Sequence, residues 1–390
     1  MDMQKERVER DAAPEKGIRY GILANPGHNR VYFDASAGMS LAELEIAARR
    51  FQAACDDFRI LEPEGIRLVT FRAAQPLQEA DLALLSRLSF VYALFELENR
   101  ADGRSALLPI RRRLSGFLGE DVGTILKYSG KTNELFTRMM LNVGILSGDF
   151  AEEADICLLD PVAGKGTTLY EAAILGWDAY GVEIAEKSVL EARTYFKKYL
   201  ETGKYKHTME KERISGEGRS FRSEMTRFEY AVSKEAQRQG RMRRLVLVEG
   251  DSRHANRYFK RNQFHLIVGD LPYGVQHGSQ GEPADAGGAG SRSGGRRGGS
   301  GAGQGGSGTP TRNPKELVRA CLPAWLDILR PGGTIVLAWN RFVLERAELA
   351  DVFRVKGLTV LDEAPYDAFV HRVDQSILRD IMVVRKERDA

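Results

Sequence analysis

The chain has 390 residues, of which 43% are hydrophobic and 28% are charged, the balance of an ordinary globular protein. Its formal net charge is only +3, which excludes a strongly basic chain, so any surface for nucleic acid must come from local clusters of Lys and Arg. The polar first segment lacks the apolar region of a signal peptide, and no apolar run is long enough to span a membrane. We therefore expect a cytoplasmic protein without a membrane partner, whose three widely separated cysteines form no metal site.

Residues 1–16 are polar and charged and predict a disordered N-terminus. Residues 17–120 mix strand and helix signals, as in a small α+β domain. Ser40 and Glu43 form a capping-box pattern that opens a helix to about Phe51, and 79–88 predicts a second helix. Strands are expected at 19–23, 30–33, 58–61, 66–71 and 90–95, with a turn at 25–27 between the first two.

Residues 122–390 predict a second domain, in which short apolar strands alternate with helices. The strands are expected at 125–128, 155–159, 179–182, 245–248, 265–268, 334–338 and 375–385, and the helices at 132–146, 168–175, 185–200 and 315–329. This alternation is typical of an α/β fold with a doubly wound, mostly parallel sheet, here of seven strands. The direction of the last strand stays open.

Two insertions interrupt this second domain. Residues 203–244 carry twice as many basic as acidic side chains, which predicts a solvated helical pair, a flexible excursion or a basic arm that contacts phosphates. Residues 278–309 consist mainly of Gly and Ser and predict a disordered spacer, because they cannot bury enough apolar surface to fold.

The strongest local signal is a glycine turn between a strand and a helix, Asp160-Pro-Val-Ala163-Gly164-Lys-Gly166-Thr167. The two glycines allow a sharp turn and a close approach of the backbone to a ligand. The acidic Glu183 ends the next strand, 23 residues after Asp160, where a carboxylate can accept hydrogen bonds from both ribose hydroxyls of a nucleoside cofactor.

Three cofactors compete for such a turn. A phosphate-binding P-loop fails because Leu159 and Ile125 stand where its first glycine is required, and a nicotinamide site fails because Leu169 replaces its third glycine. S-adenosyl-L-methionine (SAM) has no phosphate, and it needs acids for its ribose and its cationic amino group, for which Glu183 and Asp160 are available. The pattern therefore favours SAM.

A second motif, Asp270-Leu271-Pro272-Tyr273, follows the fourth parallel strand of this alternation. Ligands of doubly wound sheets bind at the carboxyl ends of the strands, so this motif and the glycine turn should face one crevice. Asp270 and the Leu271 carbonyl can accept both hydrogens of an exocyclic base amine, whose lone pair then points toward the methyl donor. Pro272 stiffens the turn, and Tyr273 can stack on a base drawn out of its helix.

Together these motifs resemble the cofactor loop and the [DN]-P-P-[YF] motif of amino-methyltransferases, and their order is similar to that of the tRNA guanosine-N2 methyltransferase family. The resemblance covers about residues 122–385. In this family an N-terminal THUMP or ferredoxin-like part often binds RNA, which implies the same role for residues 17–120. It further implies that Lys131, Thr132 and Asn133 cover the methionine end of the cofactor, and that Asp251 and Ser252 lie at its adenine.

The resemblance implies a SAM-dependent N-methyltransferase with catalytic residues at 270–273, acting on RNA, with guanosine N2 in tRNA as the leading target. Leu271 departs from the family pattern by replacing the usual first proline, although its carbonyl can still accept a hydrogen bond. Two alternatives remain open. One is a DNA methyltransferase that acts on adenine N6 or cytosine N4, and the other is a non-catalytic RNA-binding factor that retains the fold.

Overall fold

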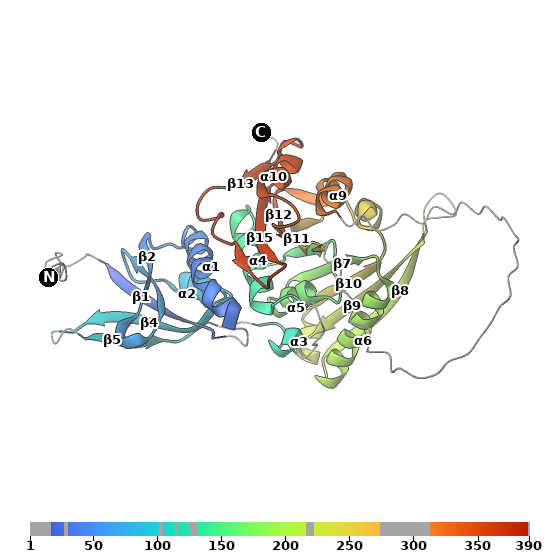
Figure 1. The fold of residues 1–390 in the computed structure, drawn as a ribbon. Coiled ribbons are helices and arrows are strands. Elements are labelled where there is room, and N and C mark those ends of the chain that lie inside the picture. Colours follow the sequence, from blue (N-terminus) through green and yellow to red (C-terminus); the bar gives the residue numbers. More distant parts are fainter. Residues whose placement is uncertain are drawn as a thin grey trace, which may run out of the picture.

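Two β-sheets with their covering helices make up the chain in the computed structural model (Figure 1). The structure describes residues 17–26, 30–100, 104–113, 116–124, 131–215, 222–273 and 313–388. The predicted disordered segments 1–16 and 278–309 and the predicted strand 125–128 lie outside these residues. Within them, no helix is both long and apolar enough to cross a membrane.

The N-terminal sheet is antiparallel, with the strand order β2-β3-β1-β4-β5. Its strands are β1 (Ile18–Ala24), β2 (Cys55–Leu61), β3 (Leu68–Ala73), β4 (Val91–Asn99) and β5 (Ser105–Ile110), with helices α1 (Arg30–Ala48) and α2 (Glu79–Ser86). Alternate residues such as Tyr20 and Ile22 are buried in the core that the sheet shares with these helices. No sequence pattern predicted β5, an edge strand whose Pro109 removes one hydrogen-bond donor.

The predicted strand 30–33 is wrong, because these residues form the first turn of α1. Val31, Tyr32 and Phe33 favour strands by intrinsic preference, but packing overrides such preferences. The helix begins at Arg30, ten residues before the predicted cap at Ser40, and it buries Met39, Leu44 and other apolar residues in the core.

The second sheet has ten strands, including β14 (His371–Arg372), which pairs only with β15. Its main path is β13 (Thr359–Leu361), β15 (Leu378–Arg385), β12 (Leu329–Asn340), β11 (Phe264–Asp270), β6 (Cys157–Asp160), β7 (Asp178–Glu183), β10 (Arg243–Glu249), β9 (Arg222–Ala231) and β8 (Lys206–Ser215). Strands β12, β11, β6, β7 and β10 pair in parallel, whereas β15 is antiparallel to both of its neighbours in this path. Seven strands from β13 to β10 form the body of the sheet. Of these seven, only β13 has no counterpart among the predicted strands.

Helices cover both faces of this sheet. Helices α4 (Glu134–Ser147), α5 (Thr167–Ile174) and α6 (Glu186–Thr202) pack in one apolar core, and α8 (Ala255–Tyr258), α9 (Pro314–Ile328) and α10 (Arg346–Arg354) pack in another. Shorter helical turns are η1 (Pro63–Gly65), α3 (Asp121–Thr124), α7 (Lys234–Arg238) and η2 (Ser252–His254). The predicted α/β fold, a doubly wound and mostly parallel sheet after a small α+β region, is confirmed.

The basic insertion is a β-hairpin, not the predicted helical pair or flexible excursion. Its strands β8 and β9 extend the sheet beyond β10, with α7 following. The physical reason is that every second residue of β9 is buried, as in a strand with one face on the core. Thr226, Phe228 and Tyr230 are all at most 1% exposed, and the two aromatic rings pack on Phe196 of α6. Charged residues at the intervening positions concealed this alternation.

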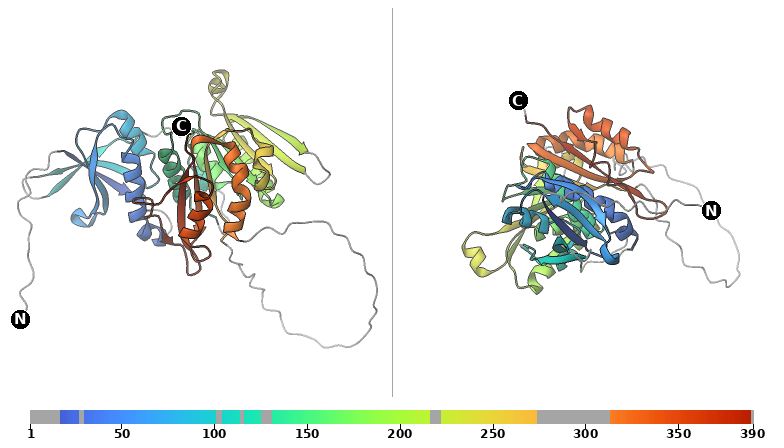
Figure 2. Two further views of the ribbon diagram at one scale, coloured as in Figure 1. Left: turned by 90° about the horizontal axis from the view of Figure 1, so that it is seen from above. Right: turned by 90° about the vertical axis from the view of Figure 1, so that its left-hand side faces the viewer.

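The two sheets are joined through α1 and α4, which lie side by side in Figures 1 and 2. Glu43 of α1 is fully buried and accepts hydrogen bonds from the Ser89 amide (3.0 Å) and from Asn142 Nδ2 of α4 (2.8 Å). Arg50 Nη2 donates to the Gly148 carbonyl after α4 (2.6 Å). These contacts fix the N-terminal sheet against the helix that leads into the candidate site.

Candidate functional site

The carboxyl ends of the parallel strands bring the predicted motifs together. Asp160, Glu183 and Asp270 are the last residues of β6, β7 and β11, and Asp251 follows β10. Residues that are far apart in the chain therefore meet at one edge of the sheet, as the sequence predicts. This is where doubly wound folds bind their ligands.

The glycine turn forms as the residue types predict. Gly164 and Gly166 have φ angles of +52° and +93°, which side chains with a Cβ rarely adopt. The Ala163 amide donates to the Val182 carbonyl of β7 (3.0 Å), which holds the turn against the next strand. Thr167 then begins α5.

Asp160 is buried beneath this turn, with 3% of its surface exposed, and its Oδ1 accepts a hydrogen bond from the Val162 amide (3.0 Å). Burial raises the pKa of Asp160 to about 7, and the negative charges of Glu183 and Asp270 add to this, while hydrogen bonds from Thr168 and Val162 oppose it. No basic group is among the causes of this shift, and two other carboxylates lie near. A cationic ligand would therefore stabilise the ionised form of Asp160.

Glu183 holds the turn from the other side. Its Oε2 accepts from the Gly164 amide and its Oε1 from the Ala185 amide, both at 2.8 Å. Each carboxylate oxygen has a second lone pair, so both oxygens can still accept from hydroxyl groups. The predicted contact with ribose hydroxyls is therefore compatible with this geometry.

Asp251 and Ser252 lie beyond β10 and are both engaged locally. Asp251 Oδ1 accepts from the Arg253 amide (2.9 Å), and its Oδ2 pairs with the Arg253 guanidinium, with Nε at 2.8 Å. Ser252 Oγ accepts from Trp325 Nε1 of α9 (3.0 Å). These bonds fix the segment that follows β10 against α9.

A cleft of about 340 Å³ opens between these strand ends and α9. Glu183, Asp251, Ser252, Asp270 and Pro272 line it among the predicted residues. Its described lining also includes the apolar Pro161, Val162, Val182, Ile184, Leu317 and Ala320, whereas Arg253 is its single basic residue and is paired with Asp251. The cleft thus combines an apolar slot with a surplus of carboxylates.

Asp270 is half-buried and accepts two side-chain hydrogen bonds. Thr132 Oγ1 donates to its Oδ2 (2.6 Å), and the Tyr273 hydroxyl donates to its Oδ1 (2.5 Å). Burial raises the pKa of Tyr273 well above its ordinary value, with the Asp270 charge as the next cause, so this hydroxyl keeps its proton as the donor. Tyr273 is therefore turned onto Asp270 in this structure, whereas the sequence motif predicts that its ring stacks on a base.

Three other predicted residues have structural contacts instead of lining the cleft. The Lys131 ammonium contacts the Gly123 carbonyl (2.5 Å) and the Glu134 carboxylate. Asn133 Oδ1 caps α4 by accepting from the Leu135 amide (2.8 Å). Leu271 is 1% exposed, and its amide donates to the Ala338 carbonyl of β12 (2.9 Å), which anchors the turn after Asp270.

Sequence reasoning missed several residues at or near the site, and three of them enter the proposals below. Ile184 is 56% exposed at the cleft and follows Glu183 directly, so its position after the acid could have identified it. Leu317 of α9 comes after the long Gly-rich insertion, and no local signal links it to the site. Arg379 of β15 approaches Asp270 from a strand more than a hundred residues later, where no motif marks it.

No protein-family model and no curated protein matches the chain. Among solved structures, TrmN from Thermus thermophilus is 13% identical, with 95% of this chain and 99% of that chain covered and a TM-score of 0.39. An rRNA methylase from Streptococcus thermophilus is 9% identical, covering 60% and 88%, with a TM-score of 0.29. A TehB-like SAM-dependent methyltransferase from Corynebacterium glutamicum is 13% identical, covering 60% and 80%, also with a TM-score of 0.29.

Proposed function

We propose that the chain is a SAM-dependent methyltransferase that methylates the exocyclic amine of an RNA base, with guanosine N2 in tRNA as the first target to test. The observation that carries this proposal is the convergence of two motifs on one cleft. The glycine turn with Asp160 and Glu183 supplies a nucleoside site, and Asp270 supplies an amine site at the same edge.

The charge of the cleft supports SAM over a dinucleotide. Three carboxylates line it, Asp160 lies beneath it, and the single cation among its described lining residues is already paired. Such a site repels the phosphates of a dinucleotide and attracts a ligand with a positive charge. In this assignment Glu183 holds the ribose, Asp160 faces the cationic amino group, and Ile184 and Leu317 flank the adenine.

The residues at Asp270 support transfer to a nitrogen. When bound, the cofactor supplies an electrophilic methyl group on a sulfonium. Asp270 accepts hydrogen bonds from the substrate amine and so orients its lone pair, which in a base is otherwise delocalised into the ring. Thr132 keeps the carboxylate in place through its 2.6 Å hydrogen bond. Positioning of this kind can supply much of a rate enhancement without strong acid–base chemistry.

Tyr273 has to leave Asp270 when substrate binds. Its hydroxyl now holds Oδ1, which is the atom that the amine would contact. Release of this hydroxyl frees both the carboxylate oxygen and the aromatic ring, and the ring can then stack on the target base. Asp270 and Tyr273 are thus proposed to act in sequence on the same base.

RNA is preferred to DNA as the substrate because of the size of the insertions. The basic insertion between α6 and β10 is a hairpin of the main sheet and not a separate domain, as a large DNA-recognition module would be. The N-terminal sheet, fixed to α4 through Glu43 and Asn142, is proposed to contact the RNA outside the target nucleotide.

The test is tritiated methyl transfer from SAM to bulk tRNA from cells that lack the gene, with duplex and single-stranded DNA assayed in parallel. Nucleoside mass spectrometry of the product then identifies the methylated atom. Methylated guanosine N2 in RNA is the expected product. Methylation of DNA alone would replace the proposal with the DNA alternative, and SAM binding without transfer to any nucleic acid would favour the non-catalytic alternative.

A further inference from the structure

Arg379 is a buried cation next to the candidate amine site. It lies on β15, its side chain is 7% exposed, and its Nη2 lies 3.8 Å from Asp270 Oδ2. Its guanidinium carbon lies 4.8 Å from the ring centroid of Phe136 and 5.2 Å from that of Tyr273. The flat group is therefore held by two aromatic rings beside the carboxylate.

One nitrogen of this buried guanidinium, Nε, has no hydrogen-bond partner among the described residues, and Asp270 does not supply one. The 3.8 Å separation between Arg379 Nη2 and Asp270 Oδ2 is too long for a hydrogen bond. Arg379 Nε is buried without a hydrogen-bond partner among the described residues. Burying a charge costs free energy unless it is paired and hydrogen-bonded, so this arrangement calls for an explanation.

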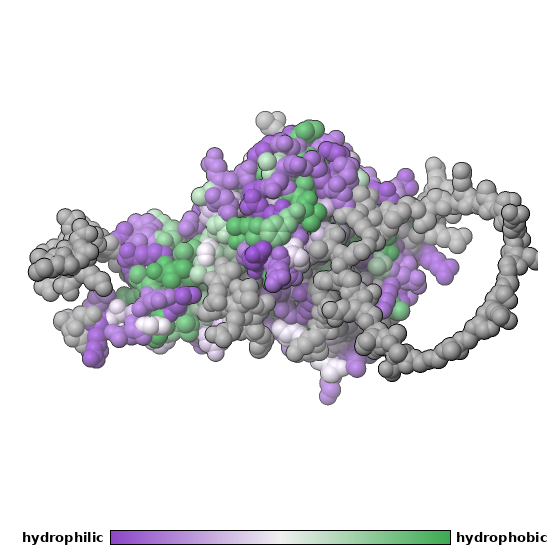
Figure 3. Space-filling view, viewed as in Figure 1, coloured by the Kyte–Doolittle hydropathy of each residue, from purple (hydrophilic) through white to green (hydrophobic). Residues whose placement is uncertain are grey.

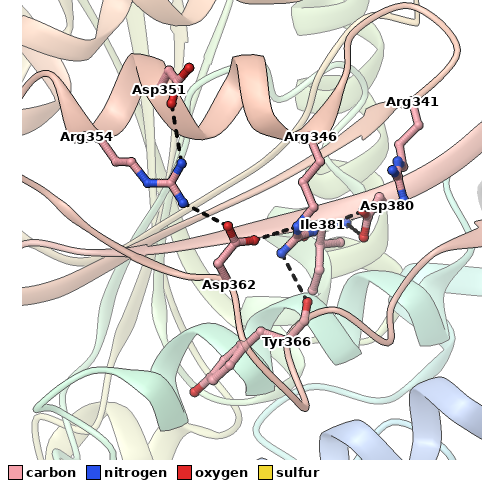
Figure 4. A network of polar contacts seen from close by, with 8 residues as sticks. All are labelled: Arg341, Arg346, Asp351, Arg354, Asp362, Tyr366, Asp380 and Ile381. Atoms are coloured by element: carbon pink, nitrogen blue, oxygen red, sulfur yellow. Dashed lines mark hydrogen bonds and ion pairs between the residues drawn. The ribbon is translucent and has the colours of Figure 1, made fainter.

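Arg346, another arginine of the same region, shows what a structural arginine looks like here (Figure 4). Its Nε donates to Asp362 (2.8 Å), and its Nη1 donates to Asp380 and to the Ile381 carbonyl, both at 3.0 Å. Its Nη2 donates to the Tyr366 carbonyl at 3.3 Å. All three nitrogens are satisfied by the protein itself, whereas Arg379 Nε has no hydrogen-bond partner among the described residues.

His371 lies beside Arg379 but does not supply a second positive charge there. His371, its cross-strand partner, contacts Phe136, and its Nδ1 lies 3.0 Å from the Phe369 carbonyl. Burial lowers the pKa of His371 to about 4, so this ring is neutral near pH 7. Arg379 thus supplies the positive charge beside Asp270, within the part of the chain that the structure describes.

An acceptor and a donor side by side match the chemistry of an amino base. In guanine, adenine and cytosine the exocyclic amine is a donor, and the carbon that bears it also bears a ring nitrogen that accepts. Asp270 can accept from the amine while a guanidinium donates to that ring nitrogen. An aliphatic amine has no such acceptor and would use only half of the pair.

We propose that Arg379 is a substrate-binding residue, which donates to the ring nitrogen next to the amine that is methylated. This inference rests on the proposed function and adds a second contact with the target base, at the ring nitrogen beside the amine. The contact with Phe136 keeps the guanidinium beside Asp270 after Tyr273 has moved, and its charge favours the acceptor over a second donor.

The test compares Arg379→Met with Arg372→Met as the matched control, using bulk tRNA from cells that lack the gene. Arg372 is an exposed arginine of the neighbouring strand, and its side chain lies over Phe342, 5.5 Å from the ring centroid. Loss of a charged hydrogen bond should lower kcat/KM by roughly 10- to 150-fold in Arg379→Met, with SAM affinity changed less than about 3-fold. Arg372→Met should stay within about 3-fold of wild type for both quantities.

A chemical rescue tests whether a guanidinium group in this position restores activity. Added guanidinium should restore part of the activity of Arg379→Ala, whereas sodium chloride at equal ionic strength should not. Absence of rescue, or unchanged kcat/KM in Arg379→Met, would overturn the assignment of Arg379 while wild-type activity on RNA leaves the proposed function intact. A wild-type protein that methylates no RNA would overturn both.

Discussion

Asp160 should make cofactor binding depend on pH, in a direction that follows from its burial. Its pKa is raised to about 7 in the ligand-free protein, chiefly by burial. A cationic ligand that contacts Asp160 binds the ionised form, so binding must release a proton from the molecules in which Asp160 is protonated. The affinity for SAM should therefore rise with pH through this range, and it should fall on acidification.

The size of the change in SAM affinity follows from the pKa of Asp160. With a pKa of about 7, the ratio of protonated to ionised Asp160 is about 10 at pH 6 and about 0.1 at pH 8. The apparent dissociation constant varies as one plus this ratio, so affinity should drop about 10-fold between pH 8 and pH 6. Asp160→Asn cannot titrate and should lose this dependence, together with most of its affinity for the cationic ligand.

The same group links pH to stability with a defined sign. Its pKa is raised in the folded protein from the ordinary 3.8, so ionised Asp160 destabilises the ligand-free fold above about pH 7, and this penalty disappears as the pH falls toward 4. The full rise corresponds to on the order of 4 kcal/mol. Asp160→Asn should therefore raise the melting temperature of the ligand-free protein, and the gain should be larger at pH 8 than at pH 5.

Isothermal titration of SAM into both proteins between pH 6 and pH 8 is the direct assay. Because the ligand titrates identically in both experiments, the ratio of the two affinities at each pH isolates Asp160. If the ratio is constant across the range, or if wild-type affinity increases toward pH 6, the reasoning from burial is refuted.

Three further changes test other parts of the site and the fold. Asp270→Ala should abolish methyl transfer and leave SAM affinity within about 3-fold, because Asp270 faces the substrate amine; wild-type turnover in this variant would show that the catalytic motif is misplaced. Gly181→Ala should weaken SAM binding, since a Cβ there would lie 2.8 Å from Ala163 Cβ and push the glycine turn outward; unchanged affinity would contradict this. Asn142→Ala should lower the free energy of unfolding by about 1–3 kcal/mol in urea titrations, because it removes a donor to the buried Glu43, and a change below about 0.5 kcal/mol would count against that contact.

Local chemistry in the sequence accounts for most of the strand ends that build the site. Asp160, Glu183 and Asp270 each follow an apolar run short enough to be a buried strand, so each was assigned to the carboxyl end of a parallel strand. Gly164 and Gly166 marked the turn because positive φ angles select glycine. These inferences needed only hydrophobic patterning and backbone preference, which act over a few residues.

Packing between distant segments decided the rest. Residues 30–33 belong to α1, which packs between the N-terminal sheet and α4. The intrinsic preferences of four residues contain no information about such packing. The hairpin β8–β9 forms because α6 offers an apolar surface to Phe228 and Tyr230. Apolar surface stabilises the fold only where another segment covers it, and the tertiary fold decides which segment that is.

What the sequence by itself determined is the order and the residue types of the site: an acid, a glycine turn, a second acid and an Asp-Leu-Pro-Tyr motif, each at or after the end of a predicted strand. Only the tertiary structure decided which side chains meet. It brought Thr132, from before α4, and Arg379, from β15, beside Asp270. The physical reason is that strand order in the sheet differs from strand order in the chain, so neighbours at its edge are set by packing and not by sequence distance.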